Sequence, residues 1–85
     1  MIPPVRPAVI ELSLDSAVND GDLVGVAEHA QLKWLILDNT DVSDAGLVFL
    51  YRLRKLRRLY VRGSRVTSAG IEKLKRALPD VEVLY

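Results

Sequence analysis

The chain contains an internal repeat of 24 residues. Residues 32–55 and 56–79 align without a gap, and seven positions are identical in the two copies. A repeat of this length indicates stacked supersecondary units, each of which buries its apolar face against a neighbour. The repeat therefore restricts the chain to a stacked architecture. The identical positions are, in the first copy, Leu32, Leu35, Val42, Ala45, Gly46, Leu50 and Arg52.

Each copy reads as a strand followed by a helix. The leading LxxLxL segment alternates apolar and other residues, as a strand does, and the remainder has apolar residues three or four apart, as on one helix face. Ser43 and Thr67 are expected to cap the helices, and Pro79 to end the second one. The predicted helix faces are Leu47, Leu50 and Leu53, and then Ile71, Leu74 and Leu78.

Small residues recur at two equivalent positions of the copies, and we interpret them as structural. Thr40 and Ser64 occupy a turn in which a hydroxyl can bond the backbone of an adjacent turn. Gly46 and Gly70 fall in the first helical turn, where a side chain is expected to clash with the neighbouring unit. Recurrence at the repeat period favours a role in stacking over catalysis.

A degenerate copy and a short strand flank the two full copies. Residues 9–31 form the first predicted unit, with Asp20 as the helix cap, and residues 32–55 and 56–80 form the next two. Residues 81–85 form a closing strand, and the Pro-rich residues 1–8 are expected to be extended and poorly ordered. The predicted inward positions of the flanking parts are Val9, Leu12 and Leu14 (strand), Leu23, Val26 and Ala30 (helix), and Val81 and Val83 (closing strand).

The full copies resemble a bacterial subclass of leucine-rich repeat proteins, whose units read LxxLxLxxTxVTDAGLxxLxxLxx. The resemblance covers about residues 9–85, and it implies an α/β solenoid of three strand–helix units plus a closing strand, with a parallel sheet on the concave side. It also implies recognition of proteins through that side. The residues that carry it are Leu32, Leu35, Leu37, Thr40, Val42, Asp44, Ala45, Gly46, Leu47 and Leu50, then Leu56, Leu59, Val61, Ser64, Val66, Ala69, Gly70, Ile71 and Leu74.

Composition excludes several classes of protein. The chain has 85 residues, enough for one small domain, and no cysteine, which excludes disulfides and thiolate metal sites. No apolar run approaches the ~20 residues of a transmembrane helix. Because no secretory signal is recognisable, we expect a cytoplasmic protein.

The sequence offers no catalytic, cofactor or metal site. His29 is the only histidine and has no second ligand at helical spacing. Residues 38–41 lack the spacing of a calcium loop, and we interpret Asp20 and Asp44 as helix-start acids. There is no Gly-rich phosphate loop and no Ser/His/Asp set. We therefore predict a protein that is not an enzyme.

Charge is unevenly distributed along the chain. Residues 1–45 carry eight acids and two bases, and residues 46–85 carry three acids and ten bases. Such polarity bears on association rather than on fold. The stretch from 52 to 65 has seven Arg or Lys and could contact phosphates, but the acidic half would repel a long duplex. Nucleic acid is therefore an unlikely partner, and no membrane is expected.

The predicted concave face is the preferred interaction surface. Outward strand positions give rows of Glu11, Trp34 and Arg58, then Ser13, Ile36 and Tyr60, then Asp15, Asp38 and Arg62. An aromatic centre with a charged rim is typical of a protein-binding hot spot. The alternative is that the aromatic rings pack only on one another and on Arg stems. The predicted protein-binding residues are Glu11, Trp34, Ile36, Asp38, Arg58, Tyr60 and Arg62.

The open ends of a short repeat array suggest a second function. An unpaired strand edge invites a partner, and the residues after Pro79 are apolar. The alternative function is a self-assembling subunit that joins head to tail through its ends and its opposite charges. The candidate end interface comprises Val81, Val83, Leu84 and Tyr85.

Overall fold

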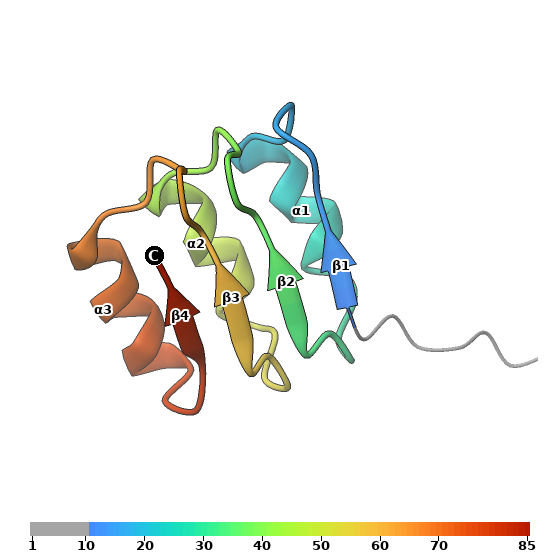
Figure 1. Ribbon diagram of the computed structural model, residues 1–85. Coiled ribbons are helices and arrows are strands. Elements are labelled where there is room, and N and C mark those ends of the chain that lie inside the picture. The colour runs from blue at the N-terminus through green and yellow to red at the C-terminus, as the bar shows by residue number, and fades with distance from the viewer. Residues whose placement is uncertain (1–10) are drawn as a thin grey trace, which may run out of the picture.

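A four-stranded parallel sheet covered on one side by helices forms the framework of the protein. The computed structural model describes residues 11–85. The predicted segment 1–8 and the predicted inward Val9 lie outside this range. The sheet has the order β1-β2-β3-β4, so neighbours in the sequence are neighbours in space, and Figure 1 shows the helices together behind the sheet. The chain is thus an α/β protein, as predicted.

The strands are short and recur at the predicted positions. They are β1 (Glu11–Ser13), β2 (Trp34–Ile36), β3 (Arg58–Tyr60) and β4 (Glu82–Leu84). The helical segments between them are the 3₁₀ helix η1 (Asp20–Asp22) and the α-helices α1 (Leu23–Val26), α2 (Asp44–Leu50) and α3 (Ser68–Ala77). No helix within residues 11–85 is long and apolar enough to cross a membrane.

The core lies between the sheet and the helices. Leu35 and Leu59 point inward from the middle of β2 and β3 and are fully buried, and Val81 and Val83 are buried as predicted. The predicted helix faces of α2 and α3 are also buried. Leu12 is only half-buried, because no strand covers β1 on its outer side within the described residues.

The first unit departs from the prediction. Its α-helix ends at Val26, so Ala27 is buried whereas the predicted core residue Ala30 is exposed. Asp20 is not the cap: Asn19 takes that place, and its side chain accepts a hydrogen bond from the N–H of Asp22. A carboxylate and an amide side chain both suit an N-cap, so the sequence alone did not distinguish Asn19 from Asp20.

Aspartates connect each helix start to the next one. The carboxylate of Asp20 accepts hydrogen bonds from the N–H of Ser43 at 2.7 Å and from its hydroxyl at 2.5 Å. Asp44 bonds Thr67 in the same two ways. The position of Ser43 as an N-cap is confirmed, but its hydroxyl donates to the preceding unit and makes no capping bond. Of these two hydroxyls, only that of Thr67 both caps its helix and bonds the preceding unit, because it donates to Asp44 and accepts from the N–H of Gly70.

The recurring glycines allow these aspartates to approach. A Cβ atom at Gly46 would collide with the carboxylate of Asp20, and one at Gly70 with that of Asp44. The predicted close approach is confirmed, and its physical reason is the position of these two carboxylates rather than general crowding. We call the bonds of Asp20 to Ser43 and of Asp44 to Thr67 the aspartate ladder.

The turn hydroxyls act within their own turn. The Thr40 hydroxyl donates to the carbonyl of Leu37 at 2.7 Å, and that of Ser64 donates to the carbonyl of Val61 at 2.6 Å. The prediction that they bond an adjacent turn is wrong, because each hydroxyl donates instead to the carbonyl three residues earlier in its own turn. Backbone groups connect the turns instead, as in the bond from the N–H of Asn39 to the carbonyl of Arg62.

Candidate functional site

Within residues 11–85, one face of the sheet is not covered by a helix, and we call it the open sheet face. The register places Trp34 between Glu11 and Arg58, and Ile36 between Ser13 and Tyr60. The first two predicted rows are thus confirmed as side-by-side neighbours. The fourth strand, whose outward residues the prediction did not include in these rows, adds Glu82 beside Arg58 and Leu84 beside Tyr60. Their positions follow from the same 24-residue spacing.

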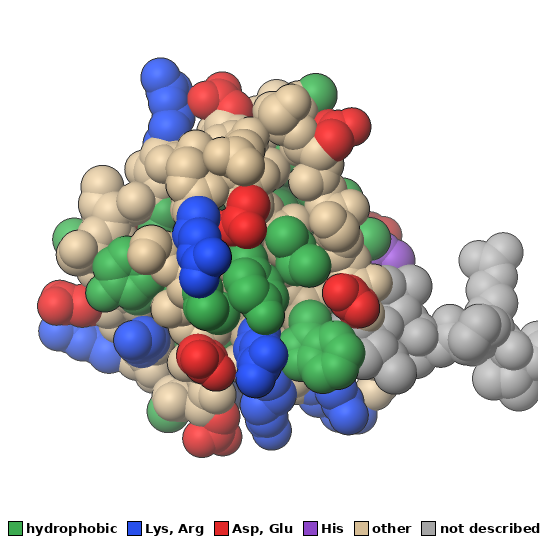
Figure 2. All heavy atoms as spheres, in the orientation of Figure 1, with side chains coloured by type: hydrophobic (Ala, Val, Ile, Leu, Met, Phe, Trp, Pro, Cys, Tyr) green, Lys and Arg blue, Asp and Glu red, His purple; other side chains and the backbone are tan. Residues whose placement is uncertain are grey.

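Apolar side chains occupy the middle of this face. Trp34 is 42% exposed, and Ile36, Tyr60 and Leu84 are each half-buried. Figure 2 shows the hydrophobic side chains together in the centre of the sheet, with acidic and basic side chains around them. Exposing an indole and an isoleucine to water costs free energy that a partner could recover.

Charged residues surround the apolar centre. The Nε of Arg58 lies 3.6 Å from a carboxylate oxygen of Glu82, and both side chains are more than half exposed, so this pair stabilises the fold only weakly. The pKa of Arg58 is raised, first by its interaction with Tyr60 and then by the charge of Glu82. Arginine is protonated even without this shift, so its guanidinium group is a cation that a partner carboxylate can bind.

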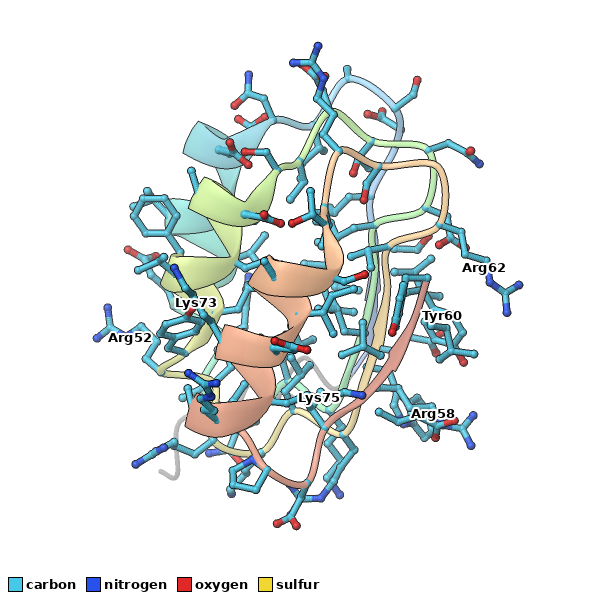
Figure 3. All side chains as sticks on the ribbon, turned by 90° about the vertical axis from the view of Figure 1, so that its left-hand side faces the viewer. Arg52, Arg58, Tyr60, Arg62, Lys73 and Lys75 are labelled. Carbon is cyan, nitrogen blue, oxygen red and sulfur yellow. The ribbon has the colours of Figure 1, made fainter. Side chains whose placement is uncertain are left out.

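The third predicted row lies just beyond the strands. A carboxylate oxygen of Asp38 accepts from the N–H of Arg62 at 2.8 Å, which leaves the exposed Arg62 side chain free to extend from the sheet. Figure 3 shows Arg58, Tyr60 and Arg62 projecting on the side opposite the helices. Asp15 is exposed and bonds the N–H of Ala17.

The candidate end interface is only partly exposed. Val81 and Val83 contribute to the core, so they offer almost no side-chain surface to a partner. Leu84 belongs to the open sheet face, and Tyr85 is 66% exposed. The end interface therefore stays a prediction, in which Leu84 and Tyr85 would supply most of the side-chain surface.

The helices expose a second set of apolar residues that the sequence reasoning missed. Val24, Val48 and Phe49 are each more than a third exposed on α1 and α2. The residues 24 positions after Val48 and Phe49 are the charged Glu72 and Lys73. The sequence offered one signal for this surface, because Val48 and Phe49 are apolar where the second copy has charged residues. Whether their side chains are exposed, however, depends on how the helices pack.

The two ends of the strands carry opposite charges. Six aspartates and two arginines, Arg62 and Arg65, lie where strands lead into helices, and we call the aspartates the acidic edge: Asp15, Asp20, Asp22, Asp38, Asp41 and Asp44. Five cations and two acids, Glu28 and Asp80, lie where helices lead into strands. One of these cations, Arg52, projects on the helix side (Figure 3), and we call the other four the basic edge: Lys33, Arg54, Lys55 and Arg57. The sequence predicted polarity between the two halves of the chain, and the fold brings charges from different units together at these edges.

Side chains that could bind a metal ion are dispersed over residues 11–85. No group of three His, Cys, Asp or Glu side chains could hold a metal ion within residues 11–85. His29 is exposed in the turn that follows α1. The open sheet face is therefore the candidate functional site.

Comparison with known proteins gives a likeness of fold. No family model and no curated protein matches the chain. Among solved structures, a chain described as "Structure of Chaetomium Mex67:Mtr2 subunits" matches with a TM-score of 0.69 and 17% identity. The match covers 91% of this chain and 52% of that one, so this chain spans about half the length of the structure that it resembles.

Proposed function

We propose that the chain is a short leucine-rich repeat domain that binds a protein through its open sheet face. The observation that carries the proposal is Trp34, exposed at the centre of an uncovered sheet between Glu11 and Arg58. The second row adds Ile36, Tyr60 and Leu84, so the apolar centre extends over three strands. Trp, Tyr and Arg are the residue types most enriched in binding hot spots.

The repeat itself supports this assignment of the two faces. The inward strand residues are leucine in both full copies except for Val61, which corresponds to Leu37. The outward ones differ in character: Trp34 corresponds to Arg58, and Ile36 to Tyr60. Stacking explains the positions that recur but not those that differ. The solved structure of similar fold is described as containing subunits, which is compatible with a protein-binding role.

Truncation of Trp34 tests the proposal. A partner is first captured from a lysate of the source organism, then purified, and its affinity is measured by calorimetry. Trp34→Ala should weaken binding by about 2 kcal/mol or more, roughly 30-fold. Phe49→Ala is the matched control, because Phe49 is 39% exposed on a helix. Equal affinity of Trp34→Ala and the unmodified protein would contradict the proposal.

Head-to-tail self-assembly is the less favoured function. Placing β4 of one copy beside β1 of the next would continue the first row with Glu82 next to Glu11, and like charges in that arrangement are destabilising. The bonds from an aspartate of one unit to the next unit would also be missing at the junction between two copies, because Ser68 occupies the position equivalent to Asp44. Sedimentation at low salt and high concentration distinguishes the two functions: we expect a monomer, and salt-sensitive oligomers would favour self-assembly.

A further inference from the structure

The acidic and basic edges differ in whether their charged groups are bonded to polar or oppositely charged groups of the fold. Every aspartate of the acidic edge accepts a hydrogen bond or forms an ion pair within the chain. Asp22 accepts from the N–H of Asn19, and Asp41 lies 3.3 Å from the Nε of Arg65. The remaining four bond Ala17, Ser43, Arg62 and Thr67. These acids are used to hold turns and to connect units.

The cations of the basic edge have no acidic partner in the described part of the chain. Arg54 donates to the carbonyl of Ala77 at 3.1 Å, and Lys55 to the side-chain oxygen of Gln31 at 2.5 Å. Arg57 makes a long bond of 3.4 Å to the carbonyl of Leu56. None of the four forms an ion pair within residues 11–85. Within the described residues, their positive charge is thus not neutralised by a direct ion pair, although Asp80 lines a pocket with Arg54 and Arg57.

These cations lie next to one another. The carbonyl of Lys33 accepts from the N–H groups of both Arg57 and Arg58, which places the starts of β2 and β3 side by side. Arg54 and Arg57 line one shallow pocket at the end of α3, where Asp80 is the acid that lines it with them. All four cationic side chains are exposed. Like charges held this close create a positive potential that attracts anions.

The basic edge is also continuous with the open sheet face. Lys33 directly precedes Trp34, and Arg57 directly precedes Arg58. Figure 2 shows Lys and Arg side chains gathered below the hydrophobic centre, at the ends where the strands begin. Because successive residues of an extended strand point to opposite faces, Lys33 and Arg57 border the open sheet face rather than lie on it. A partner seated on Trp34 would meet these cations where it extends past the starts of β2 and β3.

We propose that the partner of the open sheet face is a protein segment in which acidic residues flank an apolar anchor. The anchor contacts Trp34, Ile36 and Tyr60, and the carboxylates lie against the basic edge. This inference rests on the proposed protein-binding function and specifies the chemistry of the partner. A protein segment is favoured over nucleic acid, because Glu11, Asp38 and Glu82 share the sheet face and would repel a phosphate backbone, whereas a peptide can place uncharged residues there.

Selection from a random peptide library displayed on phage tests the inference without a known partner. We expect the selected peptides to be enriched in Asp and Glu beside one or two apolar residues. A selected peptide should bind about tenfold more weakly to Lys33→Glu/Arg57→Glu, and its affinity for the unmodified protein should fall as salt is raised. The matched control is Arg52→Glu/Lys73→Glu, which changes net charge equally on the helix side of the molecule, where Figure 3 places both residues.

The outcomes separate this inference from the proposed function. If Trp34→Ala abolishes peptide binding while Lys33→Glu/Arg57→Glu leaves it unchanged, the open sheet face stands and the acidic partner is overturned. Selected peptides without acidic enrichment overturn it as well. Binding of single-stranded poly-U RNA at physiological salt, in competition with the selected peptides, would replace the acidic protein segment with nucleic acid. If no peptide distinguishes the unmodified protein from Trp34→Ala, both proposals fail.

Discussion

The acidic and basic edges differ in what their charges do. At the acidic edge, Asp20 and Asp44 each hold the helix start of the next unit through two hydrogen bonds. At the basic edge, Lys33 and Arg57 are exposed, and neither forms an ion pair within the described residues. Asp20, Asp22 and Asp44 also suit their places, because they lie in the first turns of helices, where acids are favoured. The comparison indicates that charge stabilises the fold at one edge and remains available to a partner at the other.

Removal of Asp44 should give the largest effect on stability. Asp44→Ala loses both bonds to Thr67 and leaves a backbone N–H without its partner, so we expect a loss of about 2 kcal/mol. Urea denaturation followed by circular dichroism measures the change. Asp44→Asn retains one acceptor and should lose less. If the denaturation curve of Asp44→Ala overlaps that of the unmodified protein, the acidic edge does not stabilise the fold, and the proposed difference between the two edges is wrong.

Substitution of Gly70, which lies against the Asp44 carboxylate, should lower the free energy of unfolding by less than removal of Asp44 does. Gly70→Ala pushes a methyl group into the Asp44 carboxylate, and we expect a net loss of about 1 kcal/mol, since overpacking exceeds the gain in helix propensity. The same measurement on Gly70→Ala/Asp44→Ala should show coupling, because the colliding carboxylate is absent. Additive losses in the double variant would show that the two residues do not act together.

Gly25 provides the matched control for this substitution. A Cβ atom there would meet nothing within 4 Å, so the change adds no overlap. Gly25→Ala should therefore raise the free energy of unfolding by about 0.4–1 kcal/mol, because it reduces the entropy of the unfolded chain. A destabilised Gly25→Ala would mean that helical glycines are sensitive for a reason other than the ladder.

Removal of basic-edge cations should have the smallest effect on stability. Lys33→Ala and Arg57→Ala are expected to change the free energy of unfolding by no more than ~0.5 kcal/mol, as exposed positions without specific partners do. Thermal denaturation at low and moderate salt measures both variants. A loss comparable to that of Asp44→Ala would place the basic edge among the structural parts of the molecule.

Much of the open sheet face could be predicted from the sequence. A strand alternates its side chains between two faces, so the inward leucines fix the outward positions of Trp34 and Ile36. The 24-residue period then aligns Trp34 with Arg58 without knowledge of any contact. The period failed in the first unit, where one residue is missing and the predicted inward Ala30 is exposed.

The aspartate ladder and the two edges could not be predicted in the same way. Asp44 was interpreted as a helix-start acid, and its position at the start of α2 confirms this. Its bond to Thr67 spans 23 residues and exists only because two units stack at a defined distance. Likewise, Lys33 and Arg57 are separated along the chain and become neighbours through the parallel pairing of β2 and β3.

The sequence by itself determined the order of strands and helices, the inward and outward residues of each strand, and the need for glycine at positions 46 and 70. These follow from periodicity, which is a local property of a repeated chain. Only the tertiary structure decided which charges are used by the fold. Hydrogen bonds and ion pairs require atoms within about 3–4 Å of each other, and the stacking of units brings distant residues to that separation. It joins Asp44 to Thr67 and leaves the cations of the basic edge exposed, without an ion pair among the described residues.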